Sequence, residues 1–148
     1  NVVCEKFKPT ICIGHSVGAM ALVIFHRNHS YTNIKKIALL GAPSGFKGIM
    51  KRYKEMMGYS QTIDKGIDAL IEHRFGHHPN YFSTADFVQN LTSEGLIIHD
   101  KNDRIIPYQD ALDIDAQFKN ASLITTKGLG HGLKGDFVIG ELIKFLSH

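Results

Sequence analysis

Short, wholly apolar stretches alternate along this chain with segments in which apolar residues recur every three or four positions. A short apolar run between turn residues is typical of a strand buried on both faces of a parallel sheet, and the longer spacing is typical of helices. The predicted strands are 11–13, 37–40, 96–98 and 123–125. The predicted helices between and after them are 19–27, 110–118 and 136–146. This alternation predicts an α/β fold, with a parallel sheet of about four strands flanked by helices.

The interval 44–93 breaks the alternation, because it contains no convincing strand. A structureless loop of that length is improbable in a compact domain. Its apolar spacing predicts three helices instead, interrupted by a break at 77–80. They are a helix at 46–57, a second helix capped by Ser60 or Thr62, and a short third helix capped by Ser83 or Thr84.

The composition is that of an ordinary folded domain, because 43% of the 148 residues are hydrophobic and 21% are charged. The longest apolar run, 19–25, is far shorter than a membrane span, and no signal-peptide pattern precedes it. The net charge of +3 comes from scattered Lys and Arg residues, which argues against a nucleic-acid partner. Cys4 and Cys12 allow at most one disulfide, so we expect a reduced, cytoplasmic setting.

The strongest motif is Gly14-His15-Ser16-Val17-Gly18, which matches G-x-S-x-G. It directly follows a predicted strand and directly precedes a predicted helix. That context is typical of a nucleophile elbow, a tight turn that lifts the serine hydroxyl out of the backbone. Chance alone gives roughly 0.05 such matches in a chain of this length. We therefore expect Ser16 to be a nucleophile and both glycines to stand where a side chain would collide. The alternative is a small-residue turn where a helix packs tightly on a strand.

A serine nucleophile needs a base that is oriented by an acid, and this elbow type has them in the order Ser, Asp, His. Asp103 follows the third predicted strand, and His131 follows the fourth. The carboxyl ends of parallel strands meet at one edge, so these side chains should converge on Ser16. Asp100 is a rival for the acid. The plainer alternatives are a turn carboxylate paired with Arg104 and an exposed loop histidine.

Three segments, GHSVG, HDKNDRIIP and GLGHG, resemble in order the catalytic segments of the α/β-hydrolases and together span most of the chain. The resemblance is to the C-terminal half of such an enzyme. It implies Ser16 as nucleophile, Asp103 as acid and His131 as general base. It also implies one α/β-hydrolase-like domain, 1–148, in which 44–93 is a helical cap over the active site.

The chain departs from this family most clearly before the elbow strand. Only residues 1–10 precede that strand, and 1–8 has the pattern of the end of a helix. The α/β-hydrolases normally have strands, helices and an oxyanion-hole loop there. The amide of Val17 supplies one oxyanion donor, whereas the second has no counterpart. The pattern indicates an N-terminally truncated half of a longer enzyme.

These features predict a serine hydrolase that cleaves a carboxylic ester or related acyl bond of a small molecule through an acyl-enzyme. The substrate-binding residues stay unassigned. The alternative is an inactive fragment or interaction module that needs its N-terminal half or a partner chain. The apolar first strand, with one neighbour missing, predicts association with that half or with a second copy. We also expect Met20, Val23 and Ile24 to expose apolar surface.

No cofactor and no metal are expected. His73, His77 and His78 have a spacing that suits a metal, but no cysteine or second acid cluster lies near them in the sequence. The segment HDKNDRIIP contains a stretch, from Asp100, that begins like a calcium loop, yet Ile105 stands at the position that requires glycine.

Overall fold

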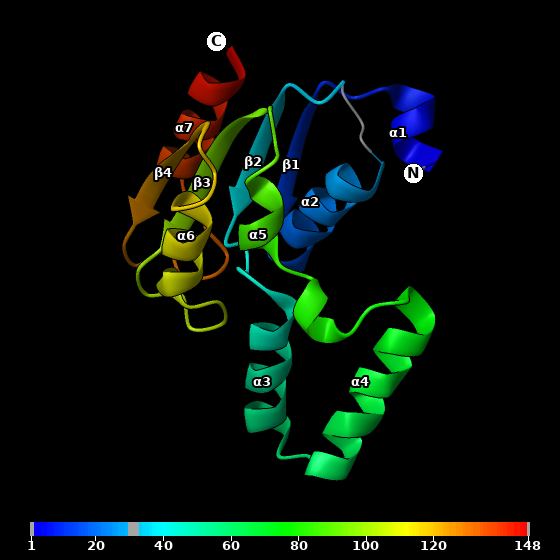
Figure 1. The fold of residues 1–148 in the computed structure, drawn as a ribbon. Coiled ribbons are helices and arrows are strands. Elements are labelled where there is room, and N and C mark those ends of the chain that lie inside the picture. The colour runs from blue at the N-terminus through cyan, green and yellow to red at the C-terminus, as the bar shows by residue number, and fades with distance from the viewer. Residues whose placement is uncertain (1, 30–32, 148) are drawn as a thin grey trace.

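The computed structural model describes residues 2–29 and 33–147, and its core is a four-stranded parallel sheet (Figure 1). The strands, in sheet order, are β1 (Ile11–His15), β2 (Lys36–Leu40), β3 (Glu94–Asp100) and β4 (Ala121–Thr126). All three neighbouring pairs run parallel. Each predicted strand lies inside an observed one, so the predicted α/β class and strand number are confirmed.

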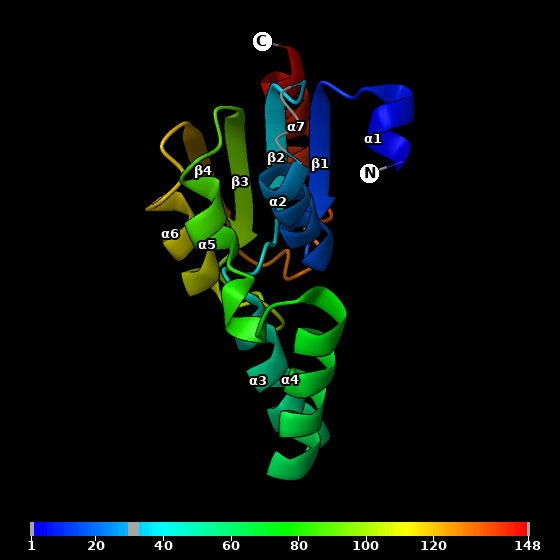
Figure 2. The same ribbon diagram turned by 45° about the vertical axis from the view of Figure 1, so that its right-hand side comes forward.

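Helices cover both faces of the sheet (Figure 2). One face carries α2 (Val17–His29), α5 (Thr84–Val88) and α6 (Tyr108–Asp115), and the other carries α7 (Asp136–Ser147). The alternation of side chains along β2 explains this arrangement, because successive residues of β2 point to opposite faces and pack in two separate cores. Ile37 and Leu39 pack with α2, α5 and α6, whereas Ala38 and Leu40 pack with α7.

The segment 44–93 is helical, as the sequence predicts, and its first two helices extend away from the carboxyl ends of the strands (Figure 1). It contains α3 (Phe46–Met57), α4 (Gln61–Phe75), the short 3₁₀ helix η1 (Pro79–Tyr81) and α5. Ser60 caps α4 and Ser83 caps α5, each accepting a hydrogen bond from a backbone amide of the first turn. By contrast with α3 and α4, α5 packs in the main core through Phe87 and Val88.

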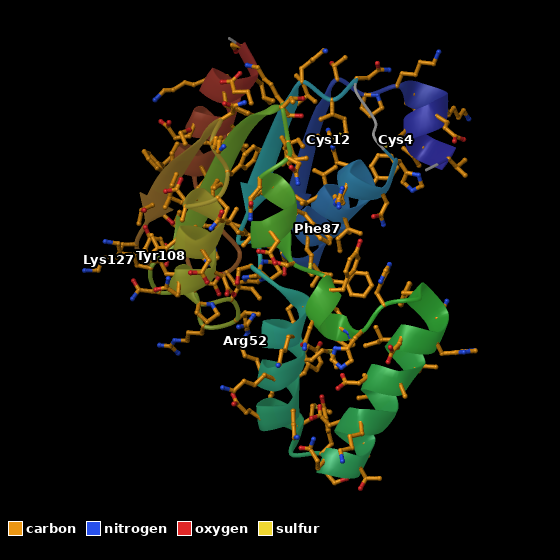
Figure 3. The ribbon with its side chains drawn as sticks, viewed as in Figure 1. Cys4, Cys12, Arg52, Phe87, Tyr108 and Lys127 are labelled. Atoms are coloured by element: carbon orange, nitrogen blue, oxygen red, sulfur yellow. The ribbon has the colours of Figure 1, made fainter. Side chains whose placement is uncertain are left out.

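An ion pair links the projecting helix α3 to α6. The guanidinium of Arg52 lies 3.2 Å from a carboxylate oxygen of Asp110 in the first turn of α6, and Arg52 leaves α3 on the side that faces α6 (Figure 3). The Ser44 hydroxyl donates to the other oxygen of the same carboxylate at 2.7 Å. Asp110 therefore anchors both the start of the segment and its first helix.

The sheet has two edge strands, β1 and β4, and we refer to the β1 edge as its open side. Among the described residues, β1 pairs only with β2. Ile11 is 39% exposed and Ile13 is 50% exposed. The short helix α1 (Val2–Phe7) precedes β1 and has no buried residue, while Asn1, the first residue of the predicted helix end, lies outside the described residues.

The predicted exposure of α2 is wrong at two of three positions. Met20 is 1% exposed and Val23 is 0% exposed, whereas Ile24 is half-buried. The reason is the rotation of α2 about its axis. Val23 faces the sheet core, and Met20 packs against Ile49 of α3 and against Ile106. None of the described helices combines the length and the apolarity that crossing a membrane requires.

Candidate active site

Ser16 occupies a tight turn between the last residue of β1 and the first residue of α2. Its φ of 55° is in the left-handed region, which residues other than glycine rarely adopt and which marks stored backbone strain. The Ser16 amide donates to the carbonyl of Leu40 on β2 at 2.8 Å, which holds the turn against the sheet. The backbone at Ser16 therefore has the tight strand-to-helix turn that the sequence predicts.

The two glycines of the motif differ in what they contribute. A Cβ at Gly14 would lie 2.5 Å from the Cα of Ala19, so no larger residue fits without moving the backbone of α2. At Gly18 an added Cβ would meet no atom within 4 Å among the described residues. The expected collision is therefore found at Gly14, and the expectation for Gly18 is wrong.

The structure brings Ser16, His131 and Asp103 together at the carboxyl ends of β1, β4 and β3. His131 Nε2 lies 3.0 Å from Ser16 Oγ, and His131 Nδ1 lies 2.7 Å from Asp103 Oδ2. Because an ionised carboxylate only accepts hydrogen bonds, Nδ1 carries a proton and donates a hydrogen bond to Asp103. Nε2 then keeps its lone pair and accepts from the Ser16 hydroxyl.

The carboxylate of Asp103 is fixed by its own loop. Its Oδ1 accepts hydrogen bonds from the amides of Ile105 at 2.8 Å and Ile106 at 2.9 Å, which leaves Oδ2 for His131. The side chain is fully buried. Among the described residues, the basic groups within 4 Å of this carboxylate are the imidazoles of His131 and His99, and Arg104 is not among them.

Asp100, the rival acid, has other partners. Its buried carboxylate accepts from the Thr126 hydroxyl at 2.7 Å and from the amides of Leu129 at 2.9 Å, Asn102 at 2.8 Å and Gly128 at 3.2 Å. Burial raises the pKa of Asp100, but these hydrogen bonds lower it by more than burial raises it. The resulting pKa is about 2. Asp100 thus ties the end of β3 to the loop that carries His131.

His15 contacts His131 and Gly41 leaves room for its ring, and sequence reasoning gave neither residue a role. His15, which precedes Ser16, donates from Nε2 to the His131 carbonyl at 2.8 Å, and the two imidazole rings are 4.9 Å apart. Gly41, with a φ of 54°, follows β2, and a Cβ there would lie 3.5 Å from the His131 ring. A local signal existed only for His15, which is part of the elbow motif.

Val17 is the first residue of α2, and its amide is placed where helix amides have no acceptor within the helix. The predicted oxyanion donor is therefore at a helix N-terminus, where partial positive charge favours an anion. Within residues 2–29 and 33–147, no three His, Cys, Asp or Glu side chains are grouped as metal ligands. His77 instead stacks on Tyr81, and His78 lies 3.8 Å from Asp68.

No protein-family model and no curated protein matches the sequence. Solved structures do match. The esterase domain of a Rhodothermus marinus protein superimposes with a TM-score of 0.64 at 18% identity, over 95% of this chain and 62% of that domain. The meta-cleavage product hydrolase of Pseudomonas fluorescens superimposes with a TM-score of 0.65 at 16% identity, over 98% of this chain and 68% of that enzyme. This chain shares the α/β fold of these two hydrolases over the part of them that it covers.

A third structure, an esterase from a Rhodococcus species, gives a TM-score of 0.63 at 15% identity, over 98% of this chain and 68% of that protein. Identities this low show the fold and nothing of the reaction. The chain spans less than two thirds of the length of the Rhodothermus marinus esterase domain. The activity must therefore be argued from the side chains of the α/β-hydrolase fold that this chain contains.

Proposed function

We propose that this α/β-hydrolase fold serves a serine hydrolase that cleaves a carboxylic ester or a related acyl bond of a small molecule. One observation carries the proposal. Ser16 Oγ, His131 and Asp103 form a continuous hydrogen-bonded chain, with 3.0 Å between Ser16 Oγ and His131 Nε2 and 2.7 Å between His131 Nδ1 and Asp103 Oδ2. This is the relation that an activated serine, a general base and its orienting acid require.

In the proposed reaction, Ser16 Oγ attacks the substrate carbonyl carbon while His131 Nε2 takes the hydroxyl proton. Asp103 stabilises the imidazolium and keeps its Nδ1 protonated. The Val17 amide donates to the oxygen that becomes negative in the tetrahedral intermediate. Collapse of this intermediate breaks the bond to the leaving group, which takes the proton from Nε2. Water, activated by the same imidazole, then releases the acid from Ser16.

The proposal includes the helical segment 44–93 as a cap over the active site, within a single domain. Its support is the position of α3 and α4 beyond the carboxyl ends of the strands (Figure 1). Ser16 follows β1 and His131 follows β4 at that same edge. Its anchor is the contact of Arg52 and Ser44 with Asp110. The chemistry proposed here uses side chains and water, and it calls for neither a metal nor another cofactor.

The open side of the sheet supports a proposed partner. A polypeptide that pairs with β1 would satisfy its outer backbone groups and cover Ile11 and Ile13. We propose that this partner is the N-terminal half of the same enzyme or a second copy of the chain. Sedimentation at micromolar concentration should show association that Ile13→Lys weakens. A monomer whose behaviour Ile13→Lys leaves unchanged would exclude a second copy of the chain as this partner.

The second candidate function is a non-catalytic module that acts only through the exposed β1 edge. A fluorophosphonate probe separates the two, because it reacts with an activated serine and spares an ordinary one. We expect a single adduct, mapped to Ser16 by peptide mass spectrometry and absent from Ser16→Ala. Ser122→Ala, at an exposed serine of β4, is the matched control and should keep the adduct. A folded chain that forms no adduct would favour the non-catalytic module.

A further inference from the structure

His99, the last residue but one of β3, is a buried histidine that takes no part in the proposed reaction. Its side chain has no exposed surface. Because the residues of a strand alternate between its faces, it points to the same face of the sheet as Ile97, which packs in the core together with α6. The ring of Tyr108, the first residue of α6, lies 6.1 Å away and nearly edge-on. His99 is therefore enclosed between the sheet and α6, out of reach of a substrate.

One nitrogen of this ring holds the loop that carries Asp103. The loop 101–107 connects β3 with α6 and has no regular secondary structure. His99 Nε2 lies 2.9 Å from the carbonyl oxygen of Ile106, and because a carbonyl oxygen only accepts, Nε2 carries a hydrogen and donates a hydrogen bond. The amide of Ile106 donates in turn to Asp103 Oδ1 at 2.9 Å. Ile106 thus connects His99 on the strand to the carboxylate on the loop.

The same nitrogen also faces the acid directly. His99 Nε2 lies 3.4 Å from Asp103 Oδ2, the oxygen that accepts the hydrogen bond of His131 Nδ1 at 2.7 Å. A contact of 3.4 Å is weaker than the bond to Ile106, but it places the partial positive charge of an N–H group beside this oxygen. Both contacts favour one position of the carboxylate, in which Oδ2 is directed at His131.

The other nitrogen of the ring destabilises the fold. His99 Nδ1 is buried and has no hydrogen-bond partner among the described residues. In the neutral ring this atom is a bare lone pair, because the hydrogen is on Nε2. An unsatisfied buried acceptor costs more free energy than an ordinary hydrogen bond contributes. Stability alone therefore gives little reason for a histidine here, and departures of this kind are expected at functional sites.

Resting on the function proposed above, we propose that His99 is a positioning residue for the acid of the triad. It holds the loop 101–107 against β3 and thereby keeps Asp103 Oδ2 within hydrogen-bonding distance of His131. Asp100, the next residue, binds the amide of Leu129 in the loop that carries His131. Two successive residues of β3, with side chains on opposite faces of the sheet, thus fix the acid and the base separately.

The first test compares two substitutions of His99 in the hydrolysis of p-nitrophenyl acetate, with kcat expressed per folded chain. His99→Phe keeps a ring of similar size but removes both nitrogens, and we expect kcat to fall by about 10- to 100-fold with little change in KM. His99→Gln keeps an N–H donor near the position of Nε2 and should stay within about threefold of the original kcat. Equal losses in the two variants, or an unchanged kcat in His99→Phe, would overturn the assignment.

Thr84 provides a matched control, because its hydroxyl is the other buried side-chain group without a hydrogen-bond partner in the part of the chain that the structure describes. Thr84→Val removes this hydroxyl at the start of α5 and should leave both kcat and KM unchanged. His99→Phe should keep Tm within a few degrees of the original, because losing the bond to Ile106 and losing the unpaired Nδ1 have opposite effects on stability. A loss of kcat in Thr84→Val equal to that in His99→Phe would contradict a role specific to His99.

A double-mutant cycle shows whether His99 acts through Asp103. Asp103→Ala removes the carboxylate and leaves a low residual turnover. Adding His99→Phe to Asp103→Ala should change this residual kcat by less than about twofold, because a residue that only positions a carboxylate has no effect once the carboxylate is absent. A further loss as large as the one that His99→Phe causes in the original chain would contradict the positioning role.

Nuclear magnetic resonance with isotope-labelled histidine keeps this inference separate from the proposed function, because it requires no turnover. The ring nitrogens of His131 should show hydrogen on Nδ1 in the original chain and in His99→Gln, and a mixture of tautomers in His99→Phe. If no ester is hydrolysed, the proposed function fails, and the tautomer of His131 alone decides the role of His99. If esters are hydrolysed and His99→Phe changes neither the tautomer nor kcat, the role of His99 is wrong and the hydrolase stands.

Discussion

The loops after β3 and β4 and the projecting helices α3 and α4 lie at the same edge of the sheet but are held in different ways. In the loops, buried carboxylates accept backbone amides at short distances, as Asp100 does from Leu129 and Asp103 from Ile106. Of the residues in α3 and α4, only Ile49 is buried. We call the loops after β3 and β4 the rigid region, because buried hydrogen bonds hold them, and we call α3 and α4 the adaptable region, because few of their residues are buried.

The largest expected effect is the loss of the proposed general base. His131→Ala removes the group that takes the Ser16 proton, and we expect turnover of a p-nitrophenyl ester to fall by about 10⁴-fold or more. His73→Ala, in the adaptable region on α4, is the matched histidine control and should stay within about twofold of the original rate. Near-normal turnover in His131→Ala would remove this residue from the mechanism.

A smaller loss is expected from Asp100, which acts through the position of His131 rather than on the substrate. Asp100→Asn keeps the shape of the side chain but removes the charge and one acceptor oxygen for its four donors. A displacement of His131 by a fraction of an ångström should lower kcat by about 10²-fold with little change in KM.

The control is Asp113→Asn, at an exposed carboxylate of α6, which should leave both constants unchanged. Because general unfolding would also lower the apparent kcat and leave KM unchanged, kcat is expressed per folded chain, with the folded fraction measured by circular dichroism. Asp100→Glu, which keeps the charge, should recover part of kcat. A change confined to KM would contradict a positioning role for Asp100.

Asp100 also predicts how the rigid region responds to acid. Its pKa in the folded state, about 2, is below its ordinary value of 3.8. The folded state therefore binds this proton less readily than the unfolded state. The carboxylate stabilises the fold above about pH 4, and this contribution is lost as the pH falls from about 4 to about 2. Thermal unfolding from pH 5 to pH 2 should show a steeper decline in Tm for the original chain than for Asp100→Asn.

The smallest effect is expected in the adaptable region. Arg52→Met removes the ion pair with Asp110 while retaining an apolar stem, and a partly exposed pair of this kind contributes about 1 kcal/mol or less. We expect Tm to fall by a few degrees at most and protease cleavage within α3 to increase. Lys51→Met, which loses a largely exposed pair with Glu55, should change neither. If Arg52→Met lowered Tm as much as Asp100→Asn does, the difference between the two regions would be contradicted.

The comparison also shows which parts of this molecule were predictable. The elbow and the helix starts depend on neighbours in the sequence, so Ser16 and the caps Ser60 and Ser83 could be read from local patterns. The partners of Asp100 lie up to 29 residues away and join only when β3 and β4 pair. Because these partners meet only in the folded chain, the sequence can indicate Asp100 as a possible acid but cannot show where its carboxylate points.

Helix orientation was the other part that local patterns could not give. Apolar spacing predicts that α2 has an apolar stripe, but the direction in which the stripe faces depends on what packs against it. Met20 is buried because it packs against Ile49 and Ile106. Ile49 belongs to α3, nearly 30 positions further along the chain, and Ile106 belongs to the loop after β3.

The central claim is that Ser16 becomes acylated with the help of His131 and Asp103, and acid quenching during turnover tests it most directly. The chain would be mixed with p-nitrophenyl butyrate, quenched within the first turnovers, digested and analysed by mass spectrometry. The account predicts a butyryl group on Ser16 that accumulates in the original chain and is missing from Ser16→Ala and His131→Ala. A butyryl group on another residue, or one on Ser16 that forms equally fast in His131→Ala, would contradict it.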